Sequence, residues 1–197
     1  NLTAGEMYDQ VQILNAMAID AHGKPLSNIV YMGMGEPLLN YREVLESVDR
    51  ITGTPGLAMS PKRITVSTAG IAKAIRRLGD DEVKFNLALS LHAANDEKRN
   101  QIMAINETNN LEALADALKH FHAKTGTRVT FEYIVFRDFN DGIRDAQELA
   151  AFCQHVPCKI NLIEYNPIDG REFKQTTPER LHAFVECLET RNLIVNV

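Results

Sequence analysis

The stretch from Asn28 to Tyr41, NIVYMGMGEPLLNY, decides the fold class of this chain. Its apolar run stops at a Gly-Glu-Pro sequence formed by Gly35, Glu36 and Pro37. An apolar run bounded by glycine and proline is typical of a buried strand. Because the residue before a proline is held in extended geometry, the direction of the Glu36 side chain is fixed. The stretch therefore predicts a strand that ends at one carboxylate, and the alternative is an ordinary turn with a solvated glutamate.

Helical and strand patterns alternate from this stretch to both ends of the chain, which is typical of parallel βα units. Strands are predicted at residues 28–34, 63–67, 84–91, 128–136, 159–165 and 193–197. Helices are predicted from a capping box at Thr3 to Gly23, at residues 41–51, 71–79, 110–124 and 143–155, and from Pro178 onward. Polar residues follow nearly every strand, which favours a partial parallel (β/α) barrel, similar to a TIM barrel, over a doubly wound sheet.

Composition is that of a soluble globular domain, with 45% hydrophobic and 24% charged residues in a chain of 197 residues. We expect one domain over residues 1–197. The net charge of −5 gives no electrostatic reason to expect nucleic-acid binding. No apolar run is long enough to span a membrane, and no leader is visible, so a cytoplasmic location without a membrane partner is expected. The absence of an initiator methionine and the strand-like last residues predict that both ends are internal to a longer protein.

Cysteine and histidine give no metal-binding pattern. The three cysteines, Cys153, Cys158 and Cys187, have spacings that match no zinc or iron–sulfur motif. The six histidines do not cluster along the sequence. We therefore expect core thiols and no metal ligand within the chain.

The polar strand ends predict one binding site, because the carboxyl ends of parallel strands lie on the same side of a sheet. Its members from the residues alone are Gly35, Glu36, Ser67, Ser90, His92 and Asn166. Neutral hydroxyl and amide groups with one carboxylate suit a ligand that carries an ammonium, a carboxylate and ribose hydroxyls. The set lacks the paired acids or the lysine that hydrolytic or aldol chemistry needs. A helix cap is the alternative role for each serine.

Five segments of the chain resemble a known family. MGMGEPLLNY, ITVSTAGI, LALSLHAANDEKR, FEY before a turn, and NLIEYNP resemble, in this order, the radical S-adenosylmethionine enzymes of the RlmN/Cfr family, which methylate C2 of an adenine in 23S rRNA and in certain tRNAs. The resemblance implies a radical S-adenosylmethionine core fold and an S-adenosylmethionine site. The residues that it implies for this site are Gly35, Glu36, Ser67, Ser90, Leu91, His92 and Asn166.

The same resemblance implies parts that this chain does not carry. A 4Fe-4S cluster would be held by a CxxxCxxC loop upstream of Asn1, and a methyl-carrying catalytic cysteine would follow Val197. The resemblance thus implies a reaction through a methyl-cysteine intermediate, with 23S rRNA and tRNA as substrates and an electron donor for the cluster. We expect the chain alone to be inactive and assign no catalytic residue to it.

Three basic residues near the strand ends, Lys98, Arg99 and Arg137, are candidates for contact with phosphate, and solvated surface charge is the favoured interpretation for each. Two other functions remain open. One is a catalytically silent S-adenosylmethionine-binding domain, and the other is a radical S-adenosylmethionine enzyme that acts on a small substrate.

Overall fold

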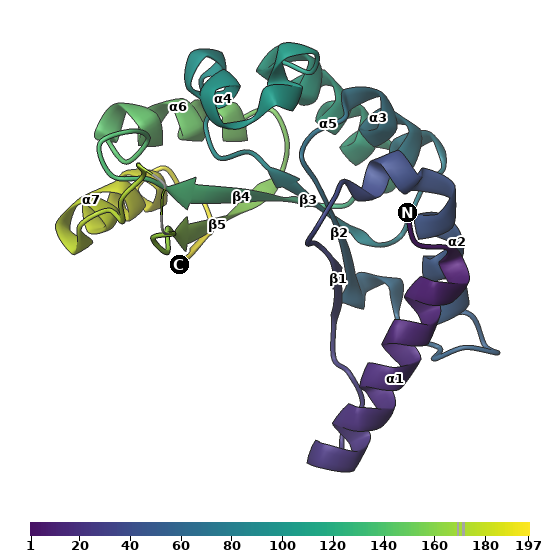
Figure 1. Ribbon diagram of the computed structural model, residues 1–197. Coiled ribbons are helices and arrows are strands. Elements are labelled where there is room, and N and C mark those ends of the chain that lie inside the picture. The colour runs from purple at the N-terminus through teal and green to yellow at the C-terminus, as the bar shows by residue number, and fades with distance from the viewer. Residues whose placement is uncertain (169, 171) are drawn as a thin grey trace. The chain divides into compact units, whose positions relative to one another are not determined.

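The structure, a computed structural model, describes residues 1–168, 170 and 172–197, and its strands form one six-stranded sheet (Figure 1). The strand order is β1-β2-β3-β4-β5-β6, the order in the sequence. The strands are β1 (Ile29–Tyr31), β2 (Ile64–Thr68), β3 (Asn86–Ser90), β4 (Val129–Val135), β5 (Cys158–Glu164) and β6 (Val195–Asn196). The pairs β1–β2, β3–β4, β4–β5 and β5–β6 are parallel, which confirms the predicted parallel α/β class.

Helices follow the strands in the predicted alternation. They are α1 (Ala4–His22), α2 (Tyr41–Thr52), α3 (Ala72–Asp80), α4 (Asp96–Ile102), α5 (Leu111–Thr125), α6 (Ile143–Cys153) and α7 (Pro178–Glu189). Three short 3₁₀ helices, η1 (Pro37–Asn40), η2 (Pro61–Arg63) and η3 (Ala104–Glu107), were not predicted, and α4 was predicted only as a turn. A helix of three or four residues is too short to give a periodic hydrophobic pattern.

Local sequence signals set the helix ends. The side chain of Thr3 accepts a hydrogen bond from the backbone N–H of Glu6, and the Glu6 carboxylate accepts one from the backbone N–H of Thr3, which forms the predicted capping box of α1. Gly23 and Gly126 end α1 and α5, each with φ of 66°, a left-handed conformation that favours glycine. Pro178 occupies the first turn of α7.

The first strand is shorter than predicted. β1 ends at Tyr31, whereas the apolar run continues to Met34. Gly33 and Gly35 have φ of 148° and 102°, and other residues rarely adopt such angles. The chain therefore leaves the sheet before the glycines, Gly35 and Glu36 lie in the loop that follows β1, and Pro37 begins η1.

The contacts divide the chain into two compact units. Unit 1 comprises Asn1–Thr68 with Lys84–Leu87, and unit 2 comprises Ala69–Val83 with Ala88–Val197. The expectation of a single domain stays a prediction.

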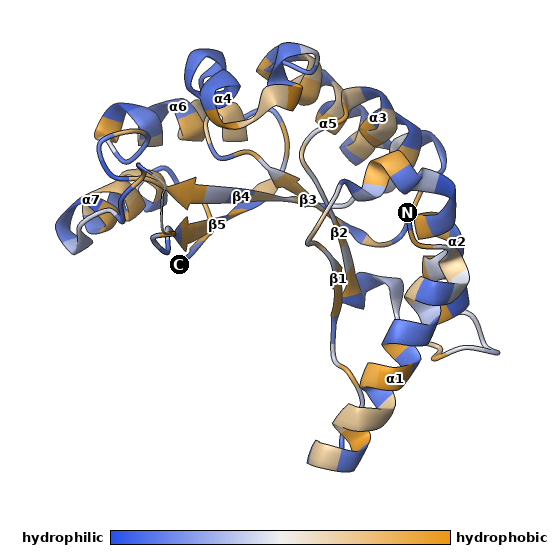
Figure 2. Ribbon diagram, in the orientation of Figure 1, coloured by the Kyte–Doolittle hydropathy of each residue, from blue (hydrophilic) through white to orange (hydrophobic). Residues whose placement is uncertain are grey.

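In unit 1, α2 buries one face, formed by Val44, Ser47, Val48 and Ile51. The Tyr31 hydroxyl lies 2.6 Å from Ser47 Oγ and joins β1 to α2. α1 contacts α2 but buries only Ala4, and hydrophobic residues lie along its exposed surface (Figure 2). The apolar pattern of α1 therefore does not mark a buried face in this unit.

In unit 2, β4 lies between β3 and β5 and forms the centre of the core. Phe131 and Tyr133 of β4 are fully buried, and so are Leu114, Leu118 and Phe121 of α5, Leu149 of α6 and Phe184 of α7. Figure 2 shows α4 as largely hydrophilic, in agreement with its polar sequence DEKRNQI. The core thus fixes the strand ends of β3, β4 and β5.

None of the helices in the described part of the chain combines the length and the hydrophobicity that crossing a membrane requires. The three cysteines are free thiols, of which Cys153 is buried and the other two are half-buried.

Candidate functional site

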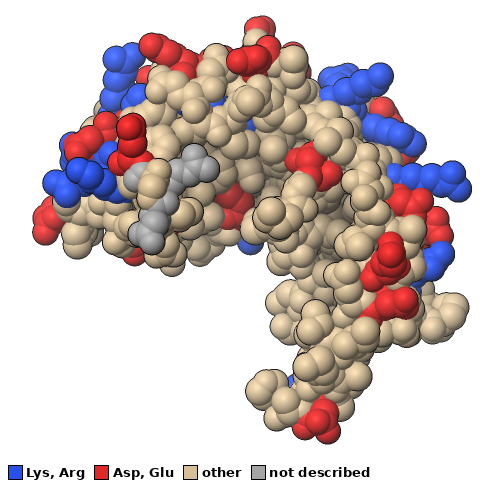
Figure 3. Space-filling view, viewed as in Figure 1, with Lys and Arg blue, Asp and Glu red and all other residues tan. Residues whose placement is uncertain are grey.

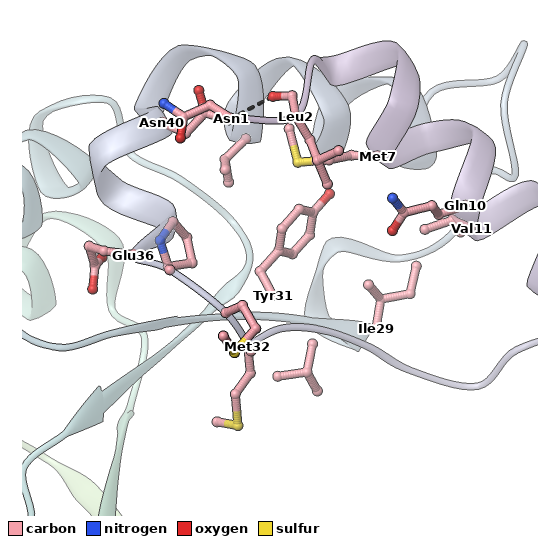
Figure 4. Close-up of a pocket in the computed structure, with 16 residues that line it drawn as sticks. Asn1, Leu2, Met7, Gln10, Val11, Ile29, Tyr31, Met32, Glu36 and Asn40 are labelled. Carbon is pink, nitrogen blue, oxygen red and sulfur yellow. Dashed lines mark hydrogen bonds between the residues drawn. The ribbon is translucent and has the colours of Figure 1, made fainter.

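A cavity of about 570 Å³ lies in unit 1, beside the loop after β1 (Figure 4). Its volume lies in the range of small-molecule sites, about 300–1,000 Å³. The predicted site residues Gly35 and Glu36 line it, and Tyr31 and Ile29 lie on the side of β1 that carries α1. Its other lining residues include Asn1, Leu2, Met7, Gln10, Met32, Gly33, Met34 and Asn40.

The Gly-Glu-Pro loop holds Glu36 in the extended geometry that the following proline imposes. Its φ and ψ are −112° and 111°. Glu36 Oε1 accepts a hydrogen bond of 2.9 Å from the backbone N–H of Leu38, so the carboxylate caps η1. This bond orients the carboxylate, and a ligand amine as its second partner stays a prediction. The alternative of a freely solvated turn glutamate does not fit the cap.

Ser67 lies in β2, also in unit 1, and is 5% exposed. Thr65, two residues earlier on the same face, pairs with Val30 of β1. Ser67 precedes α3 by several residues and does not cap it, because Ile71 is the N-cap of α3. The helix-cap alternative is therefore wrong for Ser67.

Ser90 is the last residue of β3, and Leu91 and His92 follow it in unit 2. The backbone N–H groups of Leu91 and His92 both donate to the carbonyl oxygen of Glu132 in β4, at 3.0 and 3.2 Å. Leu91 is fully buried, so its side chain belongs to the core, and a part in the predicted site stays a prediction. Asn95, and not Ser90, caps the following helix α4.

Two hydrogen bonds and a left-handed backbone fix the position of His92 after β3. Its φ of 55° is left-handed, its carbonyl oxygen accepts from Asn140 Nδ2 at 2.7 Å, and its Nδ1 accepts from the backbone N–H of Ile134 at 3.2 Å. Because Nδ1 is an acceptor, the ring proton of the neutral imidazole lies on Nε2. Burial, with a smaller effect of Arg99, lowers the pKa of His92 to about 4. At neutral pH His92 is therefore a neutral hydrogen-bond donor.

Asn140 was predicted only as a turn residue, but it is fully buried and joins the ends of β3 and β4. Its Oδ1 accepts from the backbone N–H of Phe136, and its Nδ2 donates to the carbonyl oxygens of Ile134 and His92. Its backbone carbonyl accepts from the Tyr133 hydroxyl at 3.0 Å. Its partners on β4 are close in the sequence, but His92 is 48 residues away, and this link between the two strand ends leaves no signal in the local sequence.

Both sequence interpretations of Arg99, phosphate contact and solvated surface charge, are wrong. Its side chain is fully buried in unit 2. The guanidinium donates to the carbonyl oxygens of Leu91, Ser90 and Ala69 and to Asn106 Oδ1 at 2.6 Å. Burial lowers its pKa to about 10, with Asp96 opposing, so Arg99 stays charged at neutral pH. It ties the end of β3 to the loop before α3.

The other two basic candidates also have partners. Lys98 is about one-third exposed and pairs with Asp145, and Arg137 is about half exposed and pairs with Asp138 at 3.6 Å. Asn166 lies in the exposed loop after β5. The role of the predicted set in binding stays a prediction.

The residues that the structure describes include no group of three His, Cys, Asp or Glu side chains that could hold a metal ion. These residues therefore do not fit an iron–sulfur cluster, and no step of a reaction is assigned to one.

Solved structures place the fold in the radical S-adenosylmethionine class. A radical SAM methyltransferase from Sphaerobacter thermophilus matches all of this chain and 57% of its own, with a TM-score of 0.95 and 38% identity. Streptococcus suis SuiB, in a structure bound to S-adenosylmethionine, matches 99% of this chain with a TM-score of 0.67 and 16% identity, which shows a shared fold. Both are consistent with the predicted partial barrel.

Within this class, the chain is similar in sequence to proteins named RlmN. A protein of Cytophaga hutchinsonii named probable dual-specificity RNA methyltransferase RlmN is 56% identical over all 197 residues, which correspond to 54% of that protein. No family model matches the chain. The chain is similar to RlmN proteins over its whole length, and it spans about half the length of the curated relatives it matches.

Proposed function

We propose that this chain is the core of a radical S-adenosylmethionine enzyme that methylates C2 of an adenine in 23S rRNA and in tRNA. The observation that carries the proposal is the match of the whole chain to proteins named dual-specificity RNA methyltransferases. The polar strand ends support it, because they offer the groups that S-adenosylmethionine requires.

The described residues fit S-adenosylmethionine by their chemistry. In the proposal Gly35 and the Glu36 carboxylate receive the ammonium, beside a cavity of sufficient volume. The hydroxyls of Ser67 and Ser90, the Nε2–H of His92 and the amide of Asn166 receive the carboxylate and the ribose hydroxyls. When bound, S-adenosylmethionine would supply the methyl group.

The proposal places the remaining machinery outside the described residues. A 4Fe-4S cluster, a methyl-carrying cysteine and an electron donor belong to the proposed activity of the longer protein. In the proposal the residues of this chain bind and orient S-adenosylmethionine, and none of them carries out a covalent step. The substrate adenine must leave its stack, which costs a few kcal/mol unless the RNA is already open.

The test uses the longer protein, prepared without oxygen with its cluster reconstituted, and measures iron content and methyl transfer to fragments of 23S rRNA and to tRNA. Iron with methylation at C2 of adenine supports the proposal. Binding of S-adenosylmethionine without methyl transfer to either RNA would overturn it and would favour a binding domain or a small substrate.

A matched pair of variants tests the site. Glu36→Gln is expected to weaken S-adenosylmethionine binding by roughly tenfold, because a charge-assisted hydrogen bond becomes a neutral one. Glu46→Gln, at an exposed position of α2, is the control. Equal affinity of both variants in calorimetry would remove Glu36 from the proposed site.

A further inference from the structure

A row of four polar side chains crosses the sheet in unit 2. Ser90 of β3 pairs with Glu132 of β4, Glu132 pairs with Asn161 of β5, and Asn161 pairs with Asn196 of β6. Paired residues of a parallel sheet present their side chains on the same face, about 4.8 Å apart. The row thus continues from Ser90, a residue of the proposed cofactor site, across three further strands.

The row lies on the face opposite the hydrophobic core. The neighbours of Glu132 along β4, Phe131 and Tyr133, are fully buried, and so is Ile160 beside Asn161. Side chains alternate along a strand, so the row faces away from this core. Glu132 is nevertheless only 7% exposed. A carboxylate at such depth on a non-core face calls for an explanation.

Hydrogen bonds along the row run toward Glu132. Asn196 Nδ2 donates to Asn161 Oδ1 at 3.1 Å, and Asn161 Nδ2 donates to Glu132 Oε1 at 3.0 Å. Glu132 Oε2 accepts no hydrogen bond from any residue that the structure describes. Every fully buried side-chain oxygen among the described residues has a hydrogen-bond partner. Because Oε2 has none, it is not fully buried and is accessible from the open face of the sheet. Glu132 Oε2 can therefore accept a hydrogen bond from a bound ligand.

Electrostatics agree with this geometry. Burial raises the pKa of Glu132, and the hydrogen bond from Asn161 and the charge of Lys159 oppose the rise. The carboxylate therefore gains more from one further donor than an exposed glutamate would gain.

On one side of Glu132 along the strands, the same face carries two isoleucines, and on the other side it carries Thr130 and Lys159. Ile134, two residues further along β4, pairs with Ile163 of β5, which is 38% exposed. Ile134 is also the residue whose backbone N–H holds the ring of His92. Two aliphatic side chains next to a buried acceptor fit a planar base with an amino group better than they fit a sugar or an ammonium.

We propose that Glu132 is a base-recognition residue whose Oε2 accepts a hydrogen bond from the amino group of an adenine. The inference deepens the proposed function and rests on it. The adenine belongs either to S-adenosylmethionine or to the RNA, and the recognising chemistry is the same in both cases.

The experiment uses the longer protein and the isosteric variant Glu132→Gln, which keeps an oxygen to accept from Asn161. Calorimetry compares S-adenosylhomocysteine with S-inosylhomocysteine, in which a carbonyl replaces the amino group. If the adenine is that of the cofactor, the wild-type protein prefers the adenosyl compound roughly tenfold or more, and Glu132→Gln loses this preference. If the adenine is that of the RNA, Glu132→Gln keeps the wild-type preference between the two compounds. Its affinity for unmodified tRNA, measured in saturating S-adenosylhomocysteine, then falls by a similar factor.

Glu164→Gln, at the end of β5 with its bond to Gln175, is the matched control and should match the wild type in both arms. The unfolding midpoint of ligand-free Glu132→Gln should equal that of the wild type. Glu132→Asp keeps the charge but moves the carboxylate back toward the strand, and it should lose affinity as well. Binding of both variants within twofold of the wild type in both arms overturns the inference. If the wild-type protein binds neither ligand, the proposed function itself fails, and the inference with it.

Discussion

Arg99 shows how one buried cation can organise a strand end. Its guanidinium satisfies carbonyl oxygens from the end of β3 and from the loop before α3, and it does so without a carboxylate in direct contact. A charge is expensive to bury unless its donors find acceptors, and here three hydrogen bonds go to backbone carbonyl oxygens and one goes to Asn106 Oδ1. The arginine therefore acts as a positioning residue for Ser90 and His92.

Arg99→Ala is expected to lower the free energy of unfolding by about 3 kcal/mol, because several buried carbonyl oxygens lose their donor at once. Arg77→Ala is the control, since Arg77 is 65% exposed on α3. Urea unfolding of both variants measures the difference. A loss below about 1 kcal/mol for Arg99→Ala would contradict the role that we give to its hydrogen bonds.

His92 makes the stability of the protein depend on pH. Its folded-state pKa of about 4 lies below the ordinary 6.5, so between these values the unfolded state binds the proton and the folded state does not. The free energy of unfolding therefore falls as the pH falls through this window. Between pH 7 and pH 5 this term amounts to about 2 kcal/mol.

The measurement is urea unfolding of the wild type and of His92→Asn at pH 7 and at pH 5. The wild type should lose about 2 kcal/mol more than the variant between the two values, since the variant has no imidazole at this position. An equal loss in both proteins would show that the folded state binds the proton at His92 as readily as the unfolded state does.

At the scale of elements, the helix ends are determined by one or two residues each. Gly126 ends α5 in a left-handed conformation, and a Cβ there would meet no atom within 4 Å. The need for glycine is therefore conformational and not steric. Gly5, inside α1, is the opposite case, because its φ is not positive and its nearest contact would be Arg50 Nη1 at 3.5 Å.

Gly126→Ala is expected to destabilise the protein by about 1 kcal/mol, and Gly126→Asn by less, because asparagine tolerates the left-handed region better. Gly5→Ala should instead stabilise by roughly 0.5 kcal/mol, since alanine has the higher helix propensity. Thermal unfolding of the three variants checks both signs. A stabilising Gly126→Ala would contradict the cap geometry.

At the scale of the whole molecule, charge limits what the chain can do with RNA. It has 21 Lys and Arg residues against 26 Asp and Glu residues, and Figure 3 shows the two signs intermixed on the face that it draws. The basic candidates near the strand ends are engaged with carboxylates or buried. Counterion release, the main source of affinity for phosphate backbones, is therefore small.

We expect the 197-residue chain to bind tRNA no more tightly than about 1 µM at physiological salt, in the range of non-specific binding. Fluorescence anisotropy with labelled tRNA at several salt concentrations tests this. Nanomolar affinity with a steep salt dependence would show a basic surface that the charges do not suggest.

The sequence by itself determined the order of helices and strands, the parallel α/β class and the polar strand ends, because hydrophobic period, caps and glycines act within a few residues. Only the tertiary structure decided that Arg99 is buried, that His92 carries its proton on Nε2 and that Glu132 ends a polar row. These features depend on partners that are far apart in the chain, 30 residues for Arg99 and Ala69, 48 for Asn140 and His92, and 29 for Asn161 and Glu132. Whether a polar side chain is solvated, structural or poised for a ligand is set by desolvation and by such distant partners, and local sequence contains neither.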